Sequence, residues 1–157
     1  MRTDSVLPRT IKVFFSYSHR DERLRDEMEL HLSTLKRSRL ISAWHDRKLS
    51  PGDSFNREID AQLATADLIL LLISANFLSS EYCYTKEMQR ALKRHKAGTA
   101  RVIPIIVRPA VWQDSPIGGL LALPRDGKAV TSWASRDQAW VQVAHAIRRA
   151  VDELAGS

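Results

Sequence analysis

A single glutamate, Glu87, lies where a carboxylate is hardest to explain as an ordinary surface residue. Its segment begins with a serine pair, and apolar residues then recur at helical spacing as far as Gly98. The segment therefore predicts a helix that is capped by Ser79 or Ser80 and stops at Gly98. On such a helix Glu87 lies four residues after Cys83 and borders the apolar face.

Two interpretations of this glutamate are open from its spacing. The helix directly follows the apolar run 67–74, and a carboxylate beside a strand end lies where open α/β sheets bind ligands. The alternative is a structural residue at the rim of the core, paired with a neighbouring Arg or Lys. The first interpretation predicts a binding or catalytic carboxylate, and the second predicts an ion pair.

Several other kinds of site are excluded by missing motifs. The chain has neither the glycine fingerprint of a dinucleotide-binding fold after its first apolar run nor a P-loop. The five histidines show no zinc-ligand spacing with the lone cysteine, so we expect no metal and assign them to the surface or to helix faces. They are His19, His31, His45, His95 and His145. Cys83 itself fits a small buried thiol better than a nucleophile.

Composition indicates one globular domain. The chain has 157 residues, 44% hydrophobic and 27% charged, and no apolar run near the about 20 residues of a membrane span. It shows no signal-peptide core and one cysteine, so we expect a soluble cytoplasmic protein without a membrane partner. The net charge is +6, and the basic residues are spread along the chain and fall near predicted helix ends. This placement argues against a nucleic-acid partner but leaves weak, salt-sensitive binding open.

Strand and helix patterns alternate along the chain, which predicts a three-layer α/β domain with a parallel sheet. Six consecutive Leu or Ile residues indicate a strand buried on both faces, whereas Pro104 argues against a central position for its strand. The expected strands are 11–16, 40–44, 68–74, 101–107 and 128–131, and the expected helices are 20–37, 55–65, the segment from the serine pair to Gly98, and 137–154.

Five segments, in this order and spacing, resemble a bacterial Toll/interleukin-1 receptor (TIR) domain of the NAD-cleaving type. They are Val13–Asp21, Ala43–Gly52, Leu70–Ser79, Tyr82–Glu87 and Val102–Ile105. The resemblance covers residues 11–154, which leaves 1–10 as an N-terminal extension and 155–157 as a tail or the start of a linker. It implies a flavodoxin-like sandwich with a five-stranded parallel sheet in order 2-1-3-4-5.

The resemblance also implies an activity, cleavage of the nicotinamide–ribose bond of NAD. Glu87 matches the family's catalytic glutamate, and NAD is the substrate, so no cofactor is expected. Nicotinamide leaves as a neutral molecule and needs no proton, which is why one carboxylate can suffice where most glycosidases use two. The products would be nicotinamide and either ADP-ribose or a cyclic isomer. The alternative is a non-enzymatic adaptor that acts by homotypic TIR–TIR association.

Further residues are assigned by the same resemblance. The implied substrate-binding residues are Phe14, Ser16, Tyr17, Ser18, Cys83 and Trp112, although Tyr17 and Trp112 fit half-buried core positions equally well. The polar segment 45–54 corresponds to the family's BB loop, which contacts a neighbouring subunit and can complete or uncover the active site.

That loop has a Pro-Gly turn, and its charged residues would exchange partners at little cost if exposed; the alternative is a simple solvated loop. The assembly residues expected are Trp44, Asp46, Arg47, Leu49, Pro51 and Gly52. The implied partners are NAD, other copies of the domain, and a fused or associated sensor domain, with a role in antiphage immunity.

Overall fold

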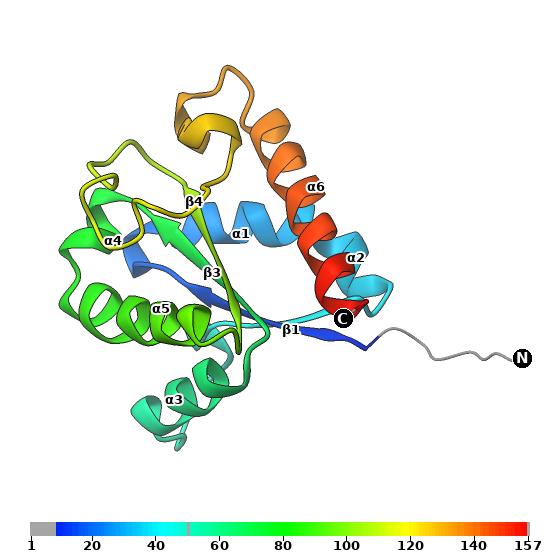
Figure 1. Ribbon diagram of the computed structural model, residues 1–157, viewed down its shortest axis with the longest axis vertical. Helices are drawn as coiled ribbons and strands as arrows, with labels where there is room; N and C mark the ends of the chain where they lie inside the picture. The colour runs from blue at the N-terminus through cyan, green and yellow to red at the C-terminus, as the bar shows by residue number, and fades with distance from the viewer. Residues whose placement is uncertain (1–8, 50, 157) are drawn as a thin grey trace, which may run out of the picture.

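One parallel sheet organises the molecule. The computed structural model describes residues 9–49 and 51–156, so residues 1–8 of the expected extension, Ser50 in the loop and Ser157 of the expected tail lie outside the described part. The strands are β1 (Ile11–Ser16), β2 (Ile41–Trp44), β3 (Leu68–Ile73) and β4 (Arg101–Ile106). They pair in the order β2-β1-β3-β4, all parallel, as Figure 1 shows.

Helices connect the strands and cover both faces. The α-helices are α1 (Glu22–His31), α2 (Ser33–Arg37), α3 (Phe55–Thr65), α4 (Ala75–Ser79), α5 (Gln89–Lys96) and α6 (Arg136–Ala155). A π-helical segment, η3 (Tyr82–Met88), runs directly into α5, and short 3₁₀ segments are η1 (His19–Asp21), η2 (Asp46–Lys48), η4 (Arg125–Gly127) and η5 (Val130–Ser132). Ala155, in the expected tail, is the last residue of α6.

The three-layer arrangement predicted from the alternation is confirmed. Helices α1, α2 and α6 pack their apolar residues on one face of the sheet, and α3 and α5 pack on the other (Figure 1). Every residue of β3 is 0% exposed, because its successive side chains enter the two cores alternately. The buried apolar strand thus fixes the strand end from which the site is built.

The expected fifth strand is absent, so the order 2-1-3-4-5 is wrong and the described sheet has four strands. Beside β4, Leu123 makes only an isolated bridge with Ile105. The next residue, Pro124, has no backbone N–H to extend such pairing. The segment 128–131 then turns into the 3₁₀ helix that begins at Val130, whose side chain is buried in the core. Core packing here outweighs strand propensity.

Pro104 lies in the edge strand β4, as its missing donor suggested. Its carbonyl accepts a hydrogen bond of 2.9 Å from the Leu123 backbone N–H. Backbone N and O of one residue in a strand face the same side, so the proline ring faces away from β3. The ladder between β3 and β4 therefore keeps its hydrogen bonds.

Candidate active site

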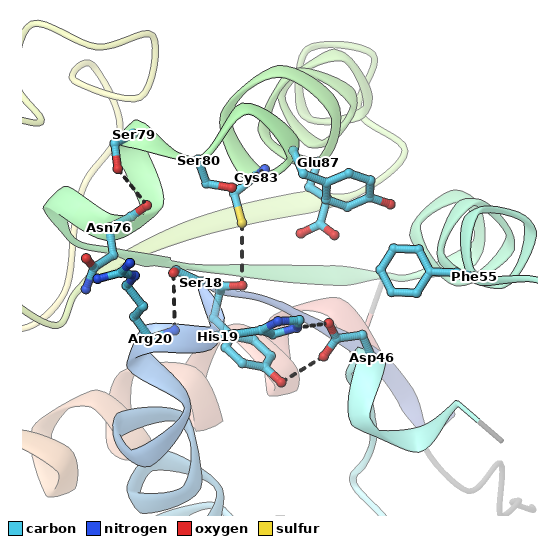
Figure 2. A pocket seen from close by; sticks show the side chains of 12 residues that line it. Ser18, His19, Arg20, Asp46, Phe55, Asn76, Ser79, Ser80, Cys83 and Glu87 are labelled. Atoms are coloured by element: carbon cyan, nitrogen blue, oxygen red, sulfur yellow. Dashed lines mark hydrogen bonds and ion pairs between the residues drawn. The ribbon is translucent and has the colours of Figure 1, made fainter. Parts of the chain in front are cut away.

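A cavity of about 690 Å³ opens where β1 and β3 end, at the point where the strand order reverses. Figure 2 shows it between the loop after β1, the loop after β2 and the helices that follow β3. Ligands bind at this position in open parallel sheets. The lining residues are Tyr17, Ser18, His19, Arg20, Asp46, Phe55, Asn76, Ser79, Ser80, Tyr82, Cys83 and Glu87.

The helix that carries Glu87 begins and ends as the sequence predicted. The Ser80 hydroxyl accepts a hydrogen bond of 3.2 Å from the Cys83 backbone N–H, and the helix stops before Gly98, whose φ of +76° suits glycine. Between them, the wider turn of η3 places residues four and five apart on one face, so that Cys83, Glu87 and Met88 are all buried.

Glu87 is a buried carboxylate on the cavity wall. It is 7% exposed and accepts a short hydrogen bond from the Ser16 hydroxyl at the end of β1. Within residues 9–49 and 51–156, no Arg or Lys forms an ion pair with it, so the rim ion pair is not what the structure contains. Burial raises the pKa of Glu87 to about 7; the Ser16 hydrogen bond opposes this shift and the Asp46 charge adds to it.

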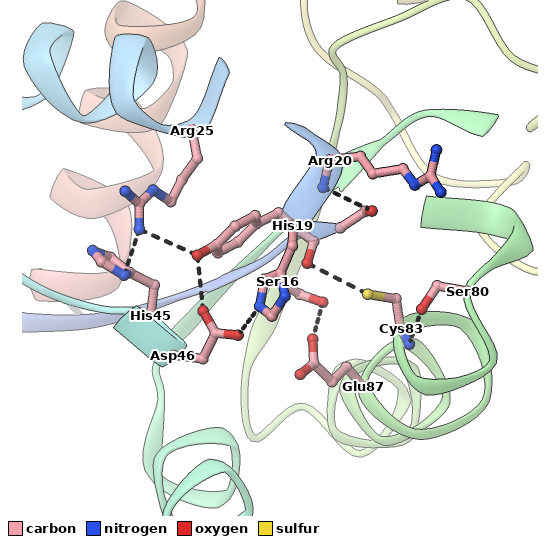
Figure 3. A network of polar contacts seen from close by, with 11 residues as sticks. Ser16, His19, Arg20, Arg25, His45, Asp46, Ser80, Cys83 and Glu87 are labelled. Atoms are coloured by element: carbon pink, nitrogen blue, oxygen red, sulfur yellow. Dashed lines mark hydrogen bonds and ion pairs between the residues drawn. The ribbon is translucent and has the colours of Figure 1, made fainter. Parts of the chain in front are cut away.

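Asp46 lies across the cavity from Glu87, and two side chains from the loop after β1 hold it in place. The Tyr17 hydroxyl donates a hydrogen bond of 2.8 Å to one carboxylate oxygen. His19 Nε2 lies 2.5 Å from the other oxygen, as Figure 3 shows for His19 and Asp46. Its side chain is 18% exposed. The expectation that exposed loop charges exchange partners freely is therefore wrong for Asp46, which is partly buried and fixed.

Behind Tyr17 lies a buried cation, Arg25. Arg25 is 6% exposed; one of its terminal nitrogens lies 3.2 Å from the Tyr17 hydroxyl and 2.5 Å from His45 Nδ1. His45 is also 6% exposed, which corrects its assignment to the surface. Burial and the Arg25 charge lower the pKa of His45, so a neutral imidazole accepts this hydrogen bond.

Asp21 ties three loops together below the cavity. Its carboxylate is 0% exposed and accepts hydrogen bonds from the Ser74 hydroxyl, from Asn76 Nδ2 at 3.2 Å and from Arg108 Nε at 2.8 Å. These partners follow β3 and β4, whereas Asp21 follows β1. The cavity floor is therefore cross-linked by one carboxylate.

Replacing Asp21 with Ala is expected to lower the free energy of unfolding by about 3 kcal/mol, since it leaves a buried hydroxyl and a cation without their partner. Urea unfolding followed by circular dichroism measures the loss. The matched control is Asp60→Ala, which removes an ion pair whose side chains are 50% and 49% exposed and should cost under about 1 kcal/mol. Equal losses of stability in both variants would contradict the role of Asp21 as a cross-link between the three loops, which we call the Asp21 clamp.

The structure brings together most of the residues expected to bind substrate. Tyr17, Ser18 and Cys83 line the cavity, and Ser16 reaches it through Glu87. Their roles toward a ligand stay predictions.

Phe14 and Trp112 do not line the cavity. Phe14 is 2% exposed and stacks on Trp44, with 5.5 Å between ring centroids, because residue 14 faces the core under α3. Trp112 packs beside Gly127 against the same core, which agrees with the alternative interpretation of that tryptophan.

Cys83 has the properties of a structural thiol. Its sulfur donates a hydrogen bond of 3.4 Å to the Tyr17 carbonyl, and burial raises its pKa to about 12. A thiolate nucleophile is therefore disfavoured at neutral pH.

The loop expected to serve assembly has one anchored part and one exposed part. Trp44 ends β2 and is half-buried, and Asp46 and Arg47 begin the short helix η2. Leu49 is half-buried, whereas Pro51 and Gly52 are exposed. Gly52 has a φ of +96°, which agrees with the predicted Pro-Gly turn. Whether these residues contact another copy stays a prediction.

Seven lining residues were not predicted from the sequence to belong to the site. They are His19, Arg20, Phe55, Asn76, Ser79, Ser80 and Tyr82. Most of them directly follow β1 or β3, so the signal available was their position after two adjacent strand ends. Phe55 begins α3, and only the fold places it here.

Two features are absent from the part of the chain that the structure describes. In residues 9–49 and 51–156, no helix is both long and apolar enough to cross a membrane. The same residues contain no group of three or more His, Cys, Asp or Glu side chains placed to hold a metal ion.

Comparisons with known proteins agree with the fold. A family model described as TIR domain matches residues 13–140. The uncharacterized protein y4lF of Sinorhizobium fredii is 54% identical over 142 residues, which cover 90% of this chain and 44% of that protein. The chain therefore spans less than half the length of this relative.

Two solved structures share the fold at low sequence identity. The TIR domain of the Toll-related receptor TRR-2 from Hydra magnipapillata has a TM-score of 0.62 and 21% identity, covering 87% of this chain and 97% of that one. The TIR domains of the activated Roq1 resistosome, which directly recognizes the pathogen effector XopQ, have a TM-score of 0.54 and 22% identity, covering 87% and 84%.

Proposed function

We propose that this chain, which belongs to the TIR domain family, cleaves the nicotinamide–ribose bond of NAD with Glu87 as its catalytic carboxylate. The observation that carries the proposal is a 7% exposed carboxylate, without a cationic partner among the described residues, on the wall of a cavity of about 690 Å³. A cavity of this size falls in the range of small-molecule sites. A buried titratable group in such a cavity is a typical catalytic candidate.

The carboxylate suits the charge changes of this reaction. As the bond to nicotinamide lengthens, positive charge moves from the pyridinium ring to the ribose, and an ionised Glu87 stabilises that charge at short range. The Ser16 hydroxyl donates to one Glu87 oxygen, which orients the carboxylate and leaves its other oxygen for the ribose hydroxyls. Attack by water gives ADP-ribose, whereas attack by the adenine ring gives a cyclic isomer.

We further propose that self-assembly activates the enzyme, in bacterial antiphage immunity. Asp46 lies on the cavity wall only a few residues before the exposed Pro51–Gly52 turn, so a neighbouring copy that binds the turn acts on the segment that carries this anchored wall residue. The bacterial relative y4lF is longer than this chain, which is compatible with a sensor domain attached to the same protein.

The test is chromatography of NAD incubated with the protein over a hundredfold range of concentration, with and without a crowding agent. Nicotinamide release that rises more steeply than protein concentration is expected, because only the assembled form turns over. Release that is strictly proportional to concentration would contradict activation by assembly. No release under any condition would favour the adaptor function, in which the domain acts by association with other TIR domains.

A further inference from the structure

The charged side chains of the cavity are segregated. Glu87 and Asp46 lie toward the end marked by Phe55, whereas Arg20 lies at the opposite end with Asn76, as Figure 2 shows. Arg20 lies beside Asn76 because Asp21, the residue that follows Arg20 in the sequence, accepts a hydrogen bond from Asn76 Nδ2. The cavity therefore has an acidic end and a basic end.

Arg20 is the charged lining residue that the protein leaves without a partner. Asp46 is paired with His19 and Glu87 is bonded to Ser16, but the Arg20 guanidinium has no ion pair or hydrogen bond to any residue of the described chain. Only its backbone N–H is engaged, with the Ser18 hydroxyl at 3.3 Å. A guanidinium presents five N–H donors in a fixed fork, and here all of them are available to a ligand.

Two hydroxyl groups, of Ser18 and Ser80, also line the cavity. Ser18 accepts the Arg20 backbone N–H, and Ser80 accepts the Cys83 backbone N–H at 3.2 Å. Because each oxygen acts as an acceptor, its own proton remains free, and no acceptor for it exists among the described residues. The nearest acid in the chain, Asp21, is fully buried and already engaged.

We propose that Arg20, Ser18 and Ser80 form an anion subsite that binds the diphosphate of a dinucleotide substrate. This inference rests on the proposed function, which it deepens by assigning the direction of the substrate. A diphosphate held by the guanidinium fork at the basic end directs the cationic nicotinamide ring to the acidic end, beside Glu87. The Asp21 hydrogen bonds hold the backbone next to Arg20, and the exposed Arg20 side chain can close on the diphosphate from there.

The test combines turnover with binding. Arg20→Gln is expected to raise KM for NAD about tenfold, because a charge-assisted hydrogen bond is lost, with kcat nearly unchanged. The same variant should cleave nicotinamide riboside as the wild type does, since that substrate has the same reacting bond and no phosphate. Arg23→Gln is the matched control, an exposed arginine on α1 that does not line the cavity.

Calorimetric titration with ADP-ribose decides the subsite even if the protein does not turn over NAD. The wild type and Arg23→Gln should bind with equal affinity, Arg20→Gln about tenfold more weakly, and the difference should shrink at high salt. Equal binding by Arg20→Gln, no binding by the wild type, or an equal loss of riboside cleavage would each overturn the proposal. Loss of nicotinamide release with ADP-ribose binding retained would refute the catalytic function alone.

Discussion

Glu87→Gln is expected to reduce nicotinamide release from NAD by roughly a hundred- to a thousandfold. Glutamine keeps the shape of the side chain and still accepts the Ser16 hydrogen bond, but it carries no charge to stabilise the developing cation. The measurement is kcat for nicotinamide release by chromatography. The matched control is Glu81→Gln, an exposed carboxylate on the same helical segment that does not line the cavity and should keep full activity.

The same variant is expected to be more stable than the wild type at high pH, which separates lost chemistry from lost folding. The pKa of Glu87 is raised from 4.5 to about 7, so the folded state holds its proton more tightly than the unfolded state. Wild-type stability is then lost as pH rises from 4.5 through 7, by up to about 3 kcal/mol, and glutamine avoids that loss. Inactive Glu87→Gln that is also destabilised at pH 8 would indicate misfolding instead.

Local sequence patterns predicted most of the strands and helices because each pattern has one physical cause. The single helix expected over 20–37 is instead η1, α1 and α2, with a break at Leu32, whose backbone leaves the helical conformation. The run Leu68–Ile73 is apolar on every residue, which only a strand buried on both faces tolerates, and its bounds were correct to one residue. The segment 128–131 has only two β-branched residues, Val130 and Thr131, and follows Pro124 at the sheet edge, and the burial of Val130 in the core decided its conformation. No short pattern contains that information.

The site was predictable in its central carboxylate and not in its supporting network. Glu87 was singled out because a helix places it beside apolar residues, but its spacing left a rim ion pair open, and only the family resemblance assigned it a catalytic role, which stays a prediction. Asp21, Arg25 and His45 lie in polar stretches that read as solvated, yet the fold buries each of them and pairs them over separations in sequence that no periodicity records. Arg20 was also missed, because the feature that distinguishes it, a side chain without a partner among the described residues, is visible only in the folded structure.

The pH dependence of NAD cleavage is expected to follow the ionisation of Glu87. Only the carboxylate can stabilise the developing cation, and burial raises its pKa to about 7. The kcat/KM for NAD should therefore level off above pH 7 and fall about tenfold for each pH unit below it, to about a hundredth at pH 5. The measurement is initial nicotinamide release at low NAD over pH 5–9. A flat profile would contradict the assignment.

Two variants should move the midpoint of that profile in opposite directions. Ser16→Ala removes the hydrogen bond that lowers the pKa of Glu87, so its midpoint should move to higher pH. Asp46→Asn removes a negative charge that raises this pKa, so its midpoint should move to lower pH while the amide can still accept from Tyr17. Asp60→Asn, at an exposed ion pair outside the cavity, should leave the midpoint in place. A general loss of packing would change activity without moving the midpoint in opposite directions in the two variants. Equal midpoints in all three variants would show that another group controls the pH dependence of the reaction.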